Sequence, residues 1–245
     1  MNAVSDDLLA LTRVPWRWEW VPSAARGQDV RAAWTEHLVT LFEGWTSEGL
    51  AAVRAVLPEE AGAAFPLTAD MVGRGAADWL LERADRLPEW ARLAWGAVFL
   101  NEKPRWAPIP VIVEFCRPEA ADPVYLMERV GAAGLDSDAR TPVIDYVTTP
   151  AGDGVRVFAL VRTTEGAAYG RLNAAMRLEG PAGDGVAGDG VDVLLTARVV
   201  ELGLMALIGQ GVEQLMQLIA AESAPQPDGA PARLRFSAPV GGGGK

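Results

Sequence analysis

The stretch that decides the fold begins with residues 143–163, which read VIDYVTTPAGDGVRVFALVRT. Two strand-like runs, 143–149 and 155–163, flank the turn sequence 150–154. Proline and glycine end both runs, and the Asp-Gly pair supplies the positive φ that a tight hairpin needs. The stretch therefore predicts two antiparallel strands joined by a hairpin.

Two more segments continue this pattern. Residues 169–179 alternate between apolar and polar side chains, which is typical of a half-buried antiparallel strand. Residues 191–200 form another strand-like run, after a connection in which the Asp-Gly turn sequence recurs. Segment 143–200 as a whole predicts an antiparallel β-meander.

After residue 200 the apolar period changes from two to about 3.6, which indicates a helix. Leu204, Ile208, Leu215 and Ile219 form one stripe, wide enough to cover a sheet face. Gly209 and Gly211 interrupt the stripe, so we expect either a kink there or two short helices that meet.

The N-terminal region has helical spacing instead. Apolar spacing and capping residues predict helices over residues 29–45, 47–57, 68–87 and 88–101. The Pro-rich segment 103–110 follows, then a strand at 109–116 and a short helix within 122–135. A run of helices followed by a run of strands predicts an α+β fold: a helical N-terminal part, then an antiparallel β-meander covered by a C-terminal helix.

This pattern divides the chain into three parts. We expect a mainly helical, Trp-rich region at 1–103 and the antiparallel sheet with its helix at 104–222. Residues 223–245 are rich in Ala, Pro and Gly, a composition that predicts a disordered tail.

Composition narrows the classes of partner and compartment. The chain has 245 residues and a formal net charge of −10, a field that disfavours binding to nucleic acid or to an anionic membrane. There is no run of about 18 uncharged apolar residues and no signal-peptide pattern, so we expect neither a membrane span nor secretion. A single cysteine suits the cytoplasm. Lysine occurs only at 103 and 245 while arginine is common, which indicates a GC-rich bacterial genome.

The sequence offers little catalytic chemistry. His37 and Cys116 are the only residues of their types, so the usual zinc ligand sets cannot be assembled, and we expect no metal and no cofactor. Nucleophile-elbow, phosphate-loop and Cys-x-x-Cys motifs are absent from the sequence. Glu114 could be a buried acid, although a solvated strand carboxylate is the more ordinary interpretation. One acidic cluster is interpreted as hairpin turns rather than a calcium site: Asp153, Asp184, Asp189 and Asp192.

Two groups of residues are candidates for binding. In the string 15–22, PWRWEWVP, an extended chain places Trp16, Trp18 and Trp20 on one face. These rings could stack on a sugar, a base or a partner protein. We favour packing within the chain, with Leu38, Phe42 and Trp45 as neighbours, because large aromatic side chains usually serve as core or interface mass.

The second group is a row of arginines expected on one sheet face. It comprises Arg156, Arg171, Arg177 and Arg198. Such a row could hold a carboxylate or phosphate. The alternative is a solvated face on which Glu179 and Asp192 are neighbours, since surface ion pairs are often incidental.

Two functions follow. The first is a noncatalytic cytoplasmic binding or assembly module, with a protein partner or a second copy. The alternative is a small-molecule-binding protein or enzyme with a pocket between the helical part and the sheet. A flat exposed aromatic patch would favour the first, and a deep pocket holding Glu114 the second.

Overall fold

The computed structural model describes residues 16–63, 66–100, 105–179 and 190–223, and it confirms the α+β fold. The helices are α2 (Gln28–Val56), α3 (Glu59–Ala63), α4 (Ala69–Asp85), α5 (Tyr125–Arg129) and α6 (Met205–Ser223). The strands are β1 (Arg17–Trp20), β2 (Ala91–Leu100), β3 (Arg105–Cys116), β4 (Val143–Thr149), β5 (Gly152–Arg162), β6 (Ala168–Leu178) and β7 (Val191–Val199). The tail predicted at 223–245 lies, except for Ser223, outside the described residues.

All seven strands form one antiparallel sheet in the order β1-β2-β3-β7-β6-β5-β4. The sheet consists of two meanders, β1–β3 and β4–β7. They are joined where β3 pairs with β7, over five residue pairs from Ile112↔Thr196 to Cys116↔Asp192. We call this junction the seam. The sheet therefore takes two of its strands, β1 and β2, from the region expected to be mainly helical.

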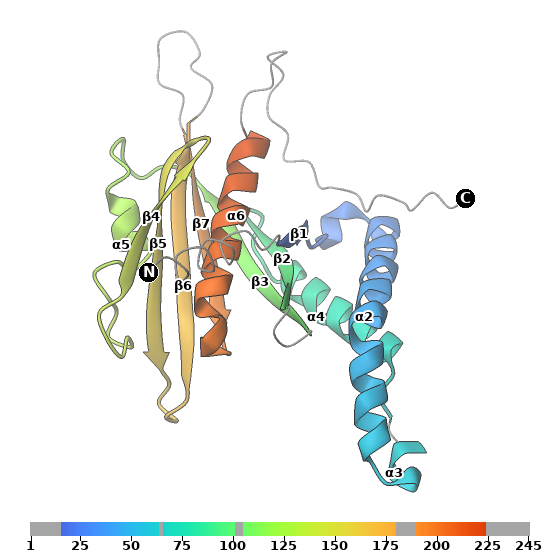
Figure 1. The fold of residues 1–245 in the computed structure, drawn as a ribbon. Helices are drawn as coiled ribbons and strands as arrows, with labels where there is room; N and C mark the ends of the chain where they lie inside the picture. Colours follow the sequence, from blue (N-terminus) through green and yellow to red (C-terminus); the bar gives the residue numbers. More distant parts are fainter. Residues whose placement is uncertain (1–15, 64–65, 101–104, 180–189, 224–245) are drawn as a thin grey trace, which may run out of the picture.

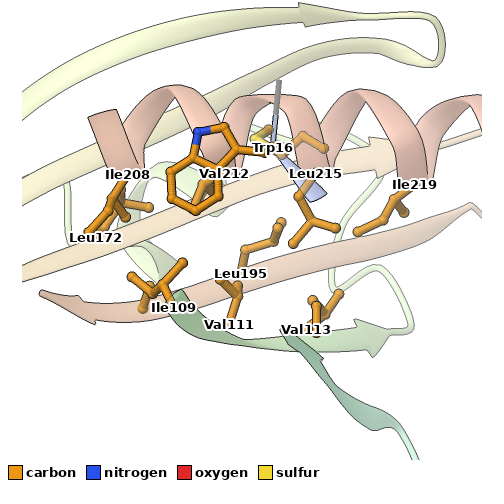
Figure 2. Close-up of a cluster of buried hydrophobic side chains, with 14 of the residues drawn as sticks. Trp16, Ile109, Val111, Val113, Leu172, Leu195, Ile208, Val212, Leu215 and Ile219 are labelled. Carbon is orange, nitrogen blue, oxygen red and sulfur yellow. The ribbon is translucent and has the colours of Figure 1, made fainter. Parts of the chain in front are cut away.

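Helix α6 covers one face of the sheet across the seam (Figure 1). Its stripe Ile208, Val212, Leu215 and Ile219 is buried against residues of β3, β6 and β7, among them Val111 (Figure 2). Burial of each such side chain stabilises the fold by roughly 1.5–3 kcal/mol, so this contact is a main source of stability. Within the described residues, Leu202–Ser223 is also the one helical segment long and apolar enough to cross a membrane, a property that a buried core helix shares.

The alternative of two short helices that meet at Gly209 and Gly211 is wrong, because α6 runs through both positions as one helix. The glycines instead make room for rings. A Cβ atom at Gly209 would overlap the ring of Phe158, and one at Gly211 would overlap the indole of Trp16. Close approach of aromatic side chains therefore explains both glycines.

The other sheet face has two separate covers. Helices α2 and α4 pack over β2, where Leu93, Trp95 and Ala97 are buried. At the other end, Leu126 and Val130 of the α5 segment pack on β5, β6 and β7. In Figure 1, α5 lies beside β4 and β5, while α2 and α4 lie at the opposite end of the sheet.

The helix predicted over 88–101 is wrong, because residues Ala91–Leu100 form strand β2. This segment is almost continuously apolar, so its period does not distinguish a helix from a strand. It is buried on both faces, with Ala94 and Val98 towards α6 and Leu93 and Trp95 towards α2 and α4. Strands buried on both faces lose the alternation that would have identified them.

The two helices expected at 29–45 and 47–57 form a single helix, α2. Ser47 does not cap a new helix, because its Oγ donates to the carbonyl oxygen of Glu43 at 2.5 Å within the same helix. The short helix expected within 122–135 is confirmed as α5.

Candidate functional site

The three tryptophans lie on the α6 side of β1 and pack against the core beneath that helix. Trp16 is 8% exposed and stacks on Trp18, with ring centroids 5.5 Å apart. Trp18 packs so closely on Gly96 of β2 that a Cβ atom there would lie 2.5 Å from the indole. Trp20 lies 6.4 Å from Phe115, centroid to centroid. Trp16 is therefore buried within the chain, and Trp18 and Trp20 are half-buried against it.

Their expected neighbours, Leu38, Phe42 and Trp45, were wrong, because all three belong to the cluster on the other face of the sheet. Phe42 and Trp45 lie across the sheet, where the Trp45 ring stacks on Trp95 with centroids 5.6 Å apart. The reason is strand alternation, which turns Arg17 and Glu19 of β1, rather than the tryptophans, towards α2. His37 of α2 accordingly has Nε2 2.9 Å from Arg17 Nη2 and 3.1 Å from Glu19 Oε1.

The four arginines do not share one face, which corrects the predicted row. Strand register places Arg156 opposite Ala174, on the α6 side, whereas Arg171 is directly opposite Arg198 on the other side. Arg156 donates to the carbonyl oxygen of Gly209 at 2.5 Å and to Glu213 at 3.0 Å, and so ties β5 to α6.

Two of the remaining arginines are held by carboxylates of the same chain. Arg171 donates to both oxygens of Asp138, at 2.9 and 2.7 Å, and the Asp138 side chain is only 3% exposed. Arg177 donates to Asp192 at 2.8 Å, and this hydrogen bond raises the pKa of the Arg177 guanidinium. Both ion pairs lie beside the α5 segment, and neither arginine offers an open anion site.

Arg198 is different, because it is exposed and lines a groove. Its Cζ lies 5.5 Å from the centroid of the Tyr169 ring. The groove has a volume of about 830 Å³ and lies between the two covers of the sheet face. Its lining consists of Trp79, Arg83, Arg86, Leu87, Leu93, Ala107, Pro108, Ile109, Pro110, Ile112, Thr196, Arg198, Val199, Val200, Glu201, Leu204 and Ile208.

Two prolines explain why the sheet opens here. The backbone N–H of Phe115 donates to the carbonyl oxygen of Trp90, on the β2 side, at 2.8 Å. Backbone groups alternate in direction along a strand, so odd-numbered residues of β3 face β2 and even-numbered residues face β7. At 108 and 110 these residues are prolines, which have no N–H. Pairing of β3 with β7 accordingly stops at Ile112. Beyond it the strands separate, and the groove passes between them.

The groove combines apolar walls with guanidinium groups. Arg83 of α4 has its Cζ 3.4 Å from the centroid of the Trp79 ring, and Arg86 pairs with Glu82. In the part of the chain that the structure describes, no carboxylate forms an ion pair with Arg83 or Arg198. Such a site can enclose an apolar body and donate hydrogen bonds to an acceptor.

Cys116 and Glu114, the candidates for nucleophilic or acid–base chemistry, do not line the groove. Burial raises the pKa of the Cys116 thiol, and the nearby Glu114 charge raises it further, so the thiolate is disfavoured. Glu114 is half-buried on β3 and is not among the described residues that line the groove. Among described residues, no three His, Cys, Asp or Glu side chains are grouped to hold a metal ion. Asp184 and Asp189 of the acidic cluster lie outside the described residues.

Sequence reasoning identified Arg198 but missed the rest of the groove. The signal was present in Pro108 and Pro110, whose spacing of two puts both missing donors on one strand edge. Arg83 and Thr196 carried no signal, because their place in the groove depends on how α4 and β7 pack.

Comparisons of this chain with protein-family models, with curated proteins and with solved structures each give no match. The interpretation of the groove therefore depends on its own geometry.

Proposed function

We propose that this chain is a noncatalytic small-molecule-binding protein whose ligand occupies the groove between α4 and the sheet. The observation that carries the proposal is the groove itself. Its volume of about 830 Å³ falls within the range typical of ligand sites, roughly 300–1,000 Å³. Mostly apolar walls with a few polar groups are the usual composition of such sites.

The polar groups of the groove support binding rather than chemistry. Three of the five are arginines, and the others are Thr196 and Glu201. Guanidinium groups donate hydrogen bonds and carry charge, but they are poor acid–base catalysts at neutral pH. The single histidine is engaged with Arg17 and Glu19 on α2 and β1.

The test is to identify what the protein carries when it is purified from cells. The wild-type protein and the variant Ile112→Trp would be analysed by native mass spectrometry and solvent extraction. Ile112 lines the groove and is 37% exposed, so a larger ring there fills the groove without entering the core. We expect a small molecule bound to the wild-type protein and lost from the variant. A molecule retained equally by both, or by neither, would contradict the proposal.

Assembly with a partner remains a second proposal, supported by one observation. The C-terminal end of α2 exposes apolar side chains, with Val53 43% and Val56 82% exposed. Patches of this kind can mark interaction sites. Light scattering of the same preparation tests assembly, because a complex has a mass above that of the 26.0 kDa chain.

A cytoplasmic location in a bacterium also stays a proposal. It is supported by the single cysteine and the arginine-rich composition.

A further inference from the structure

We propose that the ligand of the groove is an amphipathic organic carboxylate, with its carboxylate held by Arg198 and its apolar body passing between β3 and β7. This inference rests on the proposed function and adds the chemical class of the ligand. It follows from the charges around the groove and from the way they are distributed.

The charge argument begins with the whole chain. Acidic residues outnumber basic ones, 32 to 22, so an arginine in this protein has many potential partners. Arg171 pairs with Asp138, and Arg177 pairs with Asp192. Arg83 and Arg198, both on the groove, pair with no carboxylate among the described residues and contact aromatic rings instead. Two guanidinium groups that lack carboxylate partners are suited to an anionic ligand.

The distribution of polar and apolar groups determines how the ligand is oriented in the groove. Arg83 comes from α4, and Arg198 and Thr196 lie on the sheet face that α4 covers. On the α6 side of the sheet, the lining includes Ala107, Ile109, Val199, Leu204 and Ile208. The lining also contains one carboxylate, Glu201. The guanidinium groups and Thr196 are therefore at one end of the groove and this apolar group is at the other, which matches a carboxylate with a hydrocarbon body.

The backbone between the strands reinforces this direction. Pro108 and Pro110 present carbonyl oxygens and no N–H towards β7, so this part of the groove repels an anion. The carboxylate is therefore placed at Arg198 and Thr196, and the passage between the strands takes the apolar body.

The test compares two probes of equal chain length, decanoate and decan-1-ol, by isothermal titration calorimetry on the full chain. The variant Arg198→Gln removes the charge at the groove. Arg162→Gln is its control, because Arg162 is also an exposed strand arginine but does not line the groove. Ile112→Trp fills the groove, and Thr196→Trp serves as a second filling variant if the first does not fold.

We expect decanoate to bind the wild-type protein at least tenfold more tightly than decan-1-ol. Loss of a charge-assisted contact in Arg198→Gln weakens decanoate binding about tenfold or more. Decan-1-ol binding stays unchanged in that variant, and Arg162→Gln binds both probes as the wild-type protein does. A filling variant loses both probes.

Other results overturn the inference. Equal affinity for the two probes, unchanged in Arg198→Gln, means that the groove takes neutral ligands, and the proposed function then stands without a carboxylate. Decanoate binding that survives a filling variant places the carboxylate outside the groove. If neither probe binds, this inference fails, while the molecule that purifies with the protein still decides the proposed function separately.

Discussion

At the scale of single residues, Asp85 joins the end of α4 to the start of α2. Its carboxylate accepts hydrogen bonds from Arg31 Nη1 and Nη2, at 2.6 and 2.8 Å, and from the backbone N–H of Ala24 at 2.9 Å. The hydrogen bond from Arg31 lowers the pKa of Asp85. The ionised carboxylate therefore stabilises the fold above its unfolded-state pKa of about 3.9, and this contribution is lost as the pH falls through the lower folded-state pKa.

Asp85→Asn should therefore lower the free energy of unfolding at pH 7 by about 0.5–1 kcal/mol, the upper range for a partly exposed ion pair. The difference from the wild-type protein should shrink as the pH is lowered below about 3.9, measured by urea denaturation at pH 7 and at acidic pH. Asp78→Asn is the control, since Asp78 lies exposed on the same helix and makes the same change in charge. Equal losses in the two variants, or a loss that does not depend on pH, would contradict the role of Asp85.

At the scale of elements, α6 depends on Gly211 to admit Trp16. Gly→Ala within a helix normally stabilises it by about 1 kcal/mol. Here the added methyl group would overlap the Trp16 indole, and overpacking of a core typically costs about 1–3 kcal/mol. We expect Gly211→Ala to lower the melting temperature. Gly44→Ala in α2, where a Cβ atom meets nothing within 4 Å, should raise it. A higher melting temperature for both variants would refute the packing role of Gly211.

Elements differ in how far the sequence predicts them. Strands β4, β5, β6 and β7 were predicted because turns and alternation agree along the segment. Strand β2 was missed because burial on both faces removes its alternation. The predicted arginine row was wrong for another reason. Alternation assigns side chains to faces within one strand, but whether Arg156 and Arg171 share a face depends on the pairing register between their strands. The groove could not be predicted from the sequence, because α4 and β7 are brought together only by tertiary packing.

At the scale of the whole molecule, the seam is a short ladder inside the sheet. It contains five residue pairs, compared with ten between β2 and β3 and nine between β6 and β7, and only the β1–β2 ladder at the sheet edge is shorter, with four. Local opening follows the ladders with the fewest contacts. In native-state hydrogen exchange, the amides of Ile112 and Glu114 should therefore open at a lower free energy than that of Leu172 in β6. Equal opening free energies would show that the sheet opens only as a unit.

The seam also bears on the order of folding. The β2–β3 hairpin and the β4–β7 meander pair strands that follow one another closely along the chain. The seam joins residues on the order of eighty positions apart, 112 with 196, and so does the β1–β2 ladder, 17 with 97. Contacts between distant residues form late, because the intervening chain must lose entropy first. A refolding chain should therefore first form the β2–β3 hairpin and the β4–β7 meander, while their facing edges, on β3 and β7, are still unpaired. Unpaired edges attract other chains, and the prolines at 108 and 110 leave part of the β3 edge without donors, which limits aggregation while the chain is in this state.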